Sequence, residues 1–82
     1  LGDVYKRQIR YQLPKGGKVT LQIYDVLGRL VKTLVNTEQP AGYYELSWDG
    51  KEDRGQSVSS GLYFYRIQVG EFQGVKKLLL IK

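Results

Sequence analysis

Apolar and polar residues alternate along much of the chain, and a period of two residues is typical of strands that bury one face of a sheet. The first alternating stretch covers residues 9–13, with Ile9, Tyr11 and Leu13 on one side. Pro14 ends this stretch, and Lys15-Gly16-Gly17 supplies a backbone that can turn easily. We therefore expect a half-buried strand followed by a turn.

A second alternating stretch covers residues 19–24 and places Val19, Leu21 and Ile23 on one face. It is followed by Asp25-Val26-Leu27-Gly28, with Asp at the first and Gly at the fourth position of a type I turn. An Asp side chain at that position can accept hydrogen bonds from backbone N–H groups of the turn. The pattern predicts a hairpin at this point.

The third segment, residues 29–37, is ambiguous by periodicity alone. Its apolar residues fit both a strand and a short helix: they are Leu30, Val31, Leu34 and Val35. The β-branched residues and the preceding turn favour a strand. Residues 36–42, which contain Pro40 and Gly42, are expected to form a loop.

The fourth segment presents a large apolar face made by Tyr44, Leu46 and Trp48, which alternate with Tyr43, Glu45 and Ser47. We expect Trp48 to be packed deeply at the end of this strand. Residues 49–61 are polar and contain three glycines, so they are expected to form a long connection.

The last two strands can be aligned from the turn between them. If Gly70-Glu71 is a two-residue turn, as hairpins favour, Phe64 lies opposite Lys77 and Tyr63 lies opposite Leu78. The inward set is then Tyr63, Tyr65, Ile67, Val69, Leu78 and Leu80. The outward set is Leu62, Phe64, Arg66, Gln68, Val75, Lys77, Leu79 and Ile81.

These elements predict an all-β fold, an immunoglobulin-like β-sandwich of about seven short antiparallel strands. Residues 1–8 (LGDVYKRQ) lack the spacing of the rest and are expected to be a non-native or disordered lead-in, which leaves residues 9–82 as one domain. An 82-residue chain must use most of its apolar side chains for folding. Little apolar surface remains for an elaborate site.

Composition removes several classes of chemistry. The sequence has no cysteine and no histidine, which excludes disulfides, thiol chemistry and histidine-based catalysis, and argues against a zinc site. The formal net charge is +5, but the basic residues are scattered and adjacent only at Lys6-Arg7 and Lys76-Lys77. This pattern favours solvated surface charge over a nucleic-acid interface. No apolar run approaches the roughly 18 residues that a membrane-spanning helix needs.

Carboxylates gather only in the segment Asp49-Gly50-Lys51-Glu52-Asp53-Arg54-Gly55. Such a segment invites a calcium interpretation, but it lacks the EF-hand spacing and contains two basic residues. Turn capping by Asp49 and Asp53 is the better explanation. Glu52 and Asp53 are adjacent on a loop and cannot set the fixed separation that glycoside hydrolysis requires. We therefore expect no metal, no cofactor and no enzymatic activity.

The seven tyrosines could form a platform that stacks on carbohydrate, but most lie at inward positions, where core packing is the more common use. Tyr24 and Tyr43 are the outward exceptions. The outward set around Phe64, Leu79 and Ile81 is more suggestive, because contiguous exposed apolar side chains usually mark a contact surface. Cover by a neighbouring domain or loop is the alternative explanation.

Several motifs together resemble a known family. The matching residues are Tyr24, Asp25, Gly28, Arg29, Trp48, Asp49, Gly50, Gly55, Ser60, Gly61, Tyr63, Phe64, Tyr65 and Arg66, followed by Lys76-Lys77 and a run to Lys82. This pattern resembles the C-terminal type A sorting domain of proteins exported by the type IX secretion system. That domain is similar in turn to the immunoglobulin-like domain of the flagellar hook-capping protein.

The resemblance implies a non-catalytic, monomeric sorting domain on a secreted or cell-surface protein of a Gram-negative bacterium. Its implied partners are the outer-membrane secretion machinery and a fused N-terminal cargo domain, with no nucleic acid. Two alternatives stay open: a hook-cap-type assembly module, and a carbohydrate-binding or adhesion module. We expect the recognition surface to consist of Phe64, Arg66, Lys76, Lys77, Leu79, Ile81 and Lys82.

Overall fold

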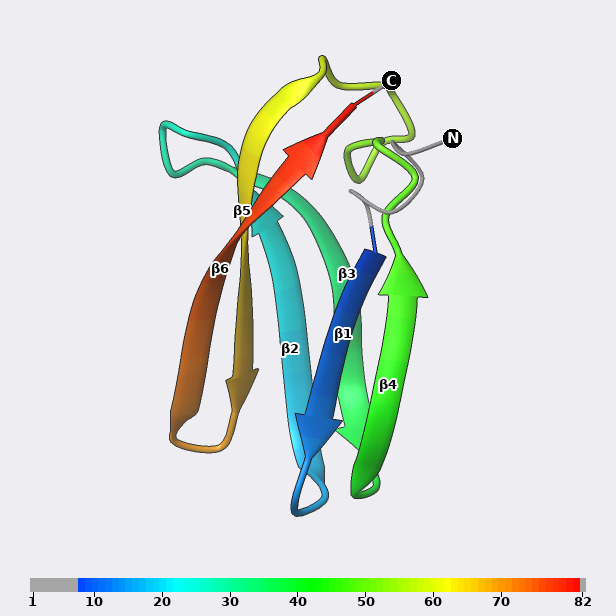
Figure 1. Cartoon of the computed structure of the whole chain (residues 1–82), viewed down its shortest axis with the longest axis vertical. Helices are drawn as coiled ribbons and strands as arrows, with labels where there is room; N and C mark the ends of the chain where they lie inside the picture. The colour runs from blue at the N-terminus through cyan, green and yellow to red at the C-terminus, as the bar shows by residue number, and fades with distance from the viewer. Residues whose placement is uncertain (1–7, 82) are drawn as a thin grey trace.

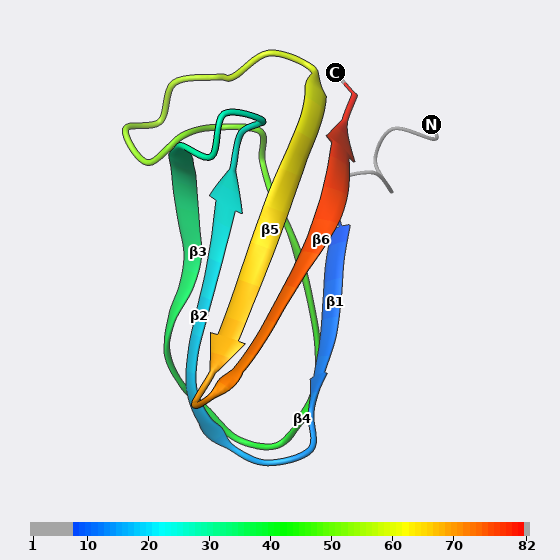
Figure 2. The ribbon, with the colours of Figure 1, turned by 90° about the vertical axis from the view of Figure 1, so that its left-hand side faces the viewer.

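The computed structural model describes residues 8–81 as two antiparallel layers of strands (Figures 1 and 2). The larger layer has four strands in the order β3-β2-β5-β6, and the smaller layer pairs β1 with β4. The strands are β1 (Gln8–Leu13), β2 (Gly17–Tyr24), β3 (Leu30–Gln39), β4 (Gly42–Ser47), β5 (Gly61–Val69) and β6 (Phe72–Leu80). The predicted immunoglobulin-like sandwich is confirmed, with six strands in the described part of the chain where about seven were expected.

The start of the domain differs by one residue from the expected boundary. Gln8, assigned to the lead-in by its sequence, is the first residue of β1 and lies opposite Ser47 of β4. The expectation for residues 1–7 lies outside the described residues. Among residues 8–81 there is no helix long and apolar enough to cross a membrane.

The core lies between the two layers and is made of the inward positions that the alternation predicted. Its buried residues are Ile9, Leu13, Val19, Leu21, Ile23, Trp48, Tyr63, Ile67, Leu78 and Leu80. Each fully buried aliphatic side chain stabilises the fold by roughly 1.5–3 kcal/mol relative to exposure. The same parity leaves the outward residues of β2, β5 and β6 on the open face of the four-stranded layer.

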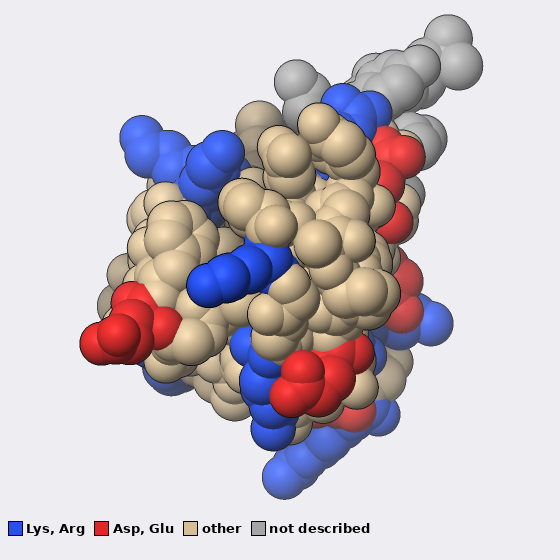
Figure 3. All heavy atoms as spheres, turned by 90° about the horizontal axis from the view of Figure 1, so that it is seen from below, with Lys and Arg blue, Asp and Glu red and all other residues tan. Residues whose placement is uncertain are grey.

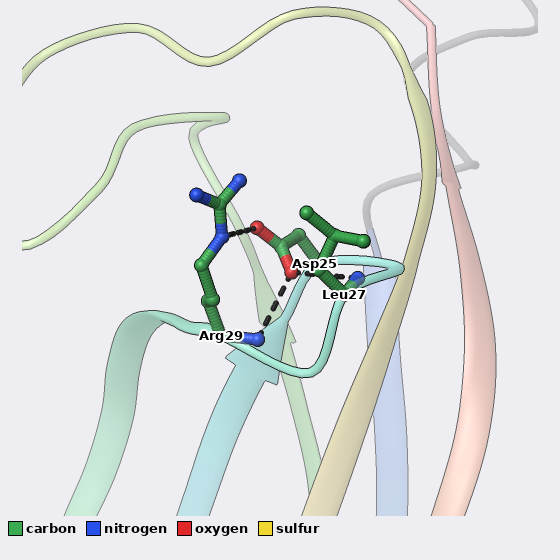
Figure 4. A network of polar contacts seen from close by, with 3 residues as sticks. All are labelled: Asp25, Leu27 and Arg29. Carbon is green, nitrogen blue, oxygen red and sulfur yellow. Dashed lines mark hydrogen bonds and ion pairs between the residues drawn. The ribbon is translucent and has the colours of Figure 1, made fainter.

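The β2–β3 hairpin has the turn that its sequence predicted. The N–H of Gly28 donates to the carbonyl of Asp25 at 3.0 Å, and Gly28 has a φ of +81°, which an L side chain rarely adopts. The Asp25 carboxylate accepts from the backbone N–H of Leu27 (2.9 Å) and of Arg29 (3.0 Å), and from Nε of Arg29 at 2.9 Å (Figure 4). Asp25, Gly28 and Arg29 therefore act together to close this turn.

The hairpin network predicts a pH-dependent stability. The hydrogen bond from the Arg29 backbone lowers the pKa of Asp25 below its ordinary value of 3.8; the Arg29 side chain and the Leu27 N–H add to this, while partial burial opposes it. A depressed folded-state pKa contributes stability that is present above the unfolded pKa and is lost as the pH falls through the folded pKa. Thermal unfolding should show Asp25→Asn less stable than the parent at about pH 7, with the gap closing at about pH 2. A gap that stays constant over this range would refute the assignment.

The expected loop at residues 36–42 is wrong, because β3 continues to Gln39 and only Pro40 and Ala41 connect it to β4. The polar residues at the end of β3 lie opposite the start of β2, with Gln39 across from Gly17 and Asn36 across from Thr20. Backbone pairing, not side-chain burial, extends this strand. Polar residues are tolerated there since β3 is an edge strand with exposed side chains.

The β5–β6 hairpin has the predicted register. Phe64 lies opposite Lys77, and Tyr63 lies opposite Leu78. The pairing continues to Val69 and Phe72, so that Gly70 and Glu71 form the two-residue turn. This register decides which face of the sheet each residue of the terminal strand occupies.

Candidate recognition surfaces

The outer face of the four-stranded sheet carries a continuous row of aromatic and basic side chains. Phe64 of β5 lies between Tyr24 of β2 and Lys77 of β6, each as its direct cross-strand partner. In the next row, Arg66 lies between Gln22 and Val75. We call this surface the outer face; its principal residues are Tyr24, Phe64, Arg66, Val75, Lys77 and Leu79.

Neutral side chains hold the guanidinium group of Arg66 on the outer face. Arg66 donates from Nε to Gln73 at 3.1 Å and from Nη2 to Gln68 at 3.2 Å. Neither Arg66 nor Lys77 forms an ion pair with a described residue. Because no carboxylate neutralises them within residues 8–81, both charges are available to a partner with negative groups.

Exposed apolar residues extend the outer face toward the β2–β3 turn. Val26 and Leu27 at the tip of the hairpin are 63% and 73% exposed, and Val75 is 60% exposed. A shallow hollow of about 240 Å³ lies between the turn and the sheet, lined by Tyr24, Asp25, Val26, Gly28, Phe64, Arg66 and Val75. Val26 and Leu27 were not among the residues expected from the sequence to form a contact surface. Their exposure could have been predicted from their place at the central positions of a tight turn, because side chains there cannot reach the core.

Only some of the residues that were predicted to form the recognition surface lie on one face of the sheet. Phe64, Arg66, Lys77 and Leu79 share the outer face, and Ile81 follows β6 and is exposed. Lys76 was expected on the same surface, but this placement is wrong. It lies opposite Tyr65 and belongs to the inward side of the sheet. Adjacent residues of a strand point to opposite faces, so Lys76 and Lys77 cannot act on the same surface. Lys82 lies outside the described residues.

The family-motif residues away from the outer face build the fold. Trp48 donates from Nε1 to the carbonyl of Lys51 at 2.9 Å and packs edge-on against Tyr63, with ring centroids 5.0 Å apart. Gly50 is buried and accepts a hydrogen bond from Val58, while Gly55 has a φ of +91° and closes a turn with Glu52. Gly61 begins β5, and Tyr65 packs against the core.

The carboxylates of the loop after β4 are bonded to backbone. Asp49 accepts from the N–H of Lys51 at 3.0 Å, as its predicted turn-capping role requires. Asp53 instead accepts from Thr33 of β3 at 3.2 Å, and Glu52 caps the local turn by accepting from Arg54 at 2.9 Å. In the part of the chain that is described, no group of three or more His, Cys, Asp or Glu side chains could hold a metal ion.

The small sheet carries a pair of stacked tyrosines. Tyr11 and Tyr44 have ring centroids 5.2 Å apart and an interplanar angle of 16°. The Tyr11 hydroxyl donates to Gln39 at 2.7 Å, and the Tyr44 hydroxyl donates to the carbonyl of Pro40. The Tyr11 hydroxyl thus ties β1 to β3 of the other layer, and the Tyr44 hydroxyl fixes the β3–β4 connection. Tyr43, at 83% exposed, is the tyrosine that projects freely from β4. The arrangement gives little support to a carbohydrate platform.

A second candidate surface is a groove of about 510 Å³ between the layers, on the side where β1 and β6 are the edge strands. Its lining is mainly apolar, from Tyr11 and Leu13 on β1 and Tyr65, Ile67 and Val69 on β5. Burial raises the pKa of both Tyr11 and Tyr65 above the ordinary value of 10.0, so these phenols stay uncharged at neutral pH. This groove could not be recognised from the sequence, because it depends on how far one layer covers the other.

The fold defines an immunoglobulin-like domain with two exposed candidate surfaces. Residues 5–71 match the family described as the FlgD Ig-like domain, and the chain belongs to this family. The resemblance to the hook-capping protein is thereby confirmed at the level of the family.

The relatives that match this chain are longer proteins. The basal-body rod modification protein FlgD of Salmonella typhimurium is 46% identical over 46 residues, which are 56% of this chain and 20% of that protein. FlgD of P. aeruginosa has a solved structure with a TM-score of 0.72 at 26% identity, over 89% of this chain and 60% of the other. The chain thus spans only part of the length of the proteins it matches.

Two further structures show the same fold. FlgD of Xanthomonas campestris, described as a hook-capping protein essential for flagellar assembly, has a TM-score of 0.68 at 24% identity over 89% of this chain and 54% of the other. PorZ of Porphyromonas gingivalis, a surface component of the type IX secretion system, has a TM-score of 0.59 at 15% identity over 98% of this chain and 12% of the other.

Proposed function

We propose that this domain is a non-catalytic protein-binding module of the hook-cap assembly type. The observation that supports the proposal is the match of residues 5–71 to the FlgD Ig-like family, together with 46% identity to the Salmonella protein over 46 residues. This favours the assembly module over the sorting domain as the first candidate. In this proposal the domain supplies a rigid surface for another protein and performs no chemistry.

The outer face is the surface that we assign to this role. Protein interfaces are enriched in aromatic residues and Arg, and Phe64 and Arg66 occupy adjacent positions at the centre of this face. The exposed apolar residues Val26, Leu27 and Val75 surround them. The scaffold beneath is buried and continuous, so the surface is held in one shape without a partner.

A type IX sorting domain is the second candidate. It is favoured by strand β6, because the terminal run from Lys76 to Lys82 lies beyond the residues matched to the FlgD family yet forms part of the sorting-domain resemblance. In that case the partners would be the outer-membrane secretion machinery and a fused N-terminal cargo, and the protein would reach the cell surface. Lys77 and Leu79 would then belong to the surface that is read.

A chimera tests the first candidate. Residues 9–82 would replace the matching immunoglobulin-like segment of the Salmonella FlgD protein, and swimming motility would be scored in cells that lack their own copy. We expect the chimera to restore motility, and Arg66→Glu or Lys77→Glu to reduce it several-fold, since either change reverses a charge at the centre of the outer face. Tyr43→Ala, on the other sheet, is the matched control and should have no effect.

The opposite outcome is also informative. If a chimera that is folded and present at the normal level supports no motility, the assembly proposal fails for this domain. A second arm fuses residues 9–82 behind a secreted reporter in a bacterium with type IX secretion. Reporter protein at the cell surface, with loss after Lys77→Glu, would establish the sorting function in its place.

A further inference from the structure

The small sheet lacks a strand on the side of the groove. In Figure 1, β1 and β4 lie toward the β2–β3 half of the large sheet, whereas β5 and β6 extend beyond them. β1 pairs only with β4, and β6 pairs only with β5, so each has one edge unpaired within the described residues. An unpaired edge beside an uncovered apolar face is the setting in which a further strand can add to a sheet.

The floor of the groove is shaped to admit such a strand. Ile67 and Val69 form part of the floor, and Gly74 lies directly opposite Ile67 on β6. A Cβ at Gly74 would lie 3.5 Å from Ile67 and 3.6 Å from Phe72, and the backbone there is ordinary extended strand. The absence of a side chain at Gly74 therefore keeps space open, and a larger residue could fill it without backbone strain.

The charges around the groove have one sign. Among the described residues, its lining includes Arg10, Lys15 and Lys76, and no Asp or Glu. Arg10 is paired with Glu45 at 2.7 Å, but neither Lys15 nor Lys76 has a carboxylate partner within residues 8–81. Seen from below, both basic and acidic side chains reach this end of the molecule, with other residues between them (Figure 3). The groove thus offers an apolar floor with unpaired positive charge.

We propose that this groove binds an extended, acidic segment of a partner protein, which adds as a third strand beside the free edge of β1. Apolar side chains of the segment cover the partly exposed Tyr65 and Val69, and its carboxylates pair with Lys15 and Lys76 at the rim. Backbone pairing supplies affinity, and the position of the acidic residues supplies selectivity. The site is separate from the outer face and does not depend on the function proposed for that face.

Charge favours such a partner over a second copy of the chain. The formal net charge is +5, so two copies repel each other, and the free edge strand β6 itself carries Lys76 and Lys77. An acidic segment is attracted by the same field. The attraction should weaken as salt is added, since the lysines are at the rim of the groove and open to solvent.

Adjacent lysines on opposite faces of β6 provide a matched test. The probe is a fluorescein-labelled synthetic peptide in which Val alternates with Glu and Thr (EVTVEVTV), titrated with the domain at low salt and followed by anisotropy. We expect Lys76→Glu to weaken binding about tenfold, because it reverses one of the unpaired charges. Lys77→Glu, which makes the same change on the outer face, should alter binding less than about twofold. A peptide with Lys in place of Glu should not bind.

A second variant tests the space in the groove without changing charge. Gly74→Val should abolish binding, while thermal unfolding stays equal to or above that of the parent because a β-branched residue suits a strand. The proposal is overturned if the parent does not bind the acidic peptide, if Lys77→Glu weakens binding as much as Lys76→Glu, or if Gly74→Val binds normally. Sedimentation of the free domain as a dimer that Gly74→Val dissociates would identify a second copy as the occupant instead.

Discussion

Deletion of residues 76–82 should unfold the domain. The deletion removes Leu78 and Leu80, which are 5% and 0% exposed, and takes from β5 five of its nine residue pairs with β6. Shortening a single buried Leu to Ala costs about 2–5 kcal/mol, and small domains are stable by only about 5–15 kcal/mol. The loss of two such residues and a strand segment therefore exceeds what the rest of the core can offset.

Circular dichroism and urea unfolding of the truncated domain measure this loss. The control is Leu79→Ser, which changes the neighbouring residue on the outer face and should leave the unfolding transition within about 0.5–1 kcal/mol of the parent. A truncated domain that still unfolds cooperatively would show that β6 is dispensable for the fold. The result also decides how recognition should be tested, because truncation removes the fold together with the surface, whereas charge reversal at Lys77 changes the surface alone.

The fold could be predicted because it depends on local features of the sequence, namely the alternation of apolar residues in each strand and the residues of each turn. Alternation assigned Val19, Leu21 and Ile23 to the core, and the Asp25–Gly28 turn fixed the hairpin that follows. The two-residue turn at Gly70 then set the register of β6, in which hydrophobicity alone is ambiguous over residues 78–81. In a strand with apolar residues on both faces, the geometry of the turn, and not the composition of the strand, determines which residues face the core.

The errors share a different cause. β3 reaches Gln39 through backbone pairing with β2, and no apolar side chain marks that extension. Lys76 was grouped with Lys77 as one basic pair, although the register that was correctly predicted places the two residues on opposite faces. Both errors come from judging residues by their neighbours in the sequence. The pairing of strands instead determines where a strand ends and which face a side chain occupies.

The groove beside β1 could not be predicted from the sequence, because it arises from the lateral offset of the two layers. Tyr65 and Val69 have the inward parity of core residues, and nothing in the sequence indicates that the small sheet stops short of covering them completely. The outer face was more accessible to prediction, since parity alone assigns Phe64 and Arg66 to it. Surfaces that belong to one sheet follow from the sequence more readily than those that lie between sheets.

Replacement of Trp48 by Ala should destabilise the domain by about 3–5 kcal/mol, a large fraction of the stability of a chain of this size. Trp48 is 1% exposed, packs edge-on against Tyr63, and lies at the point where β4 passes into the long loop. Its indole N–H also donates to the carbonyl of Lys51 at 2.9 Å, so it fixes the start of that loop. Alanine would leave a cavity in the core and a carbonyl without its donor.

Urea unfolding of two further variants separates these effects. Trp48→Phe refills much of the cavity but cannot donate to Lys51, so it should lose about 1–3 kcal/mol, less than Trp48→Ala. Tyr43→Ala, which removes an aromatic side chain that is 83% exposed on β4, should stay within about 0.5 kcal/mol of the parent. Equal losses for Trp48→Ala and Tyr43→Ala would mean that Trp48 does not organise the core. The ordering expected here follows because burial, and not aromatic character, determines the stabilisation by each ring.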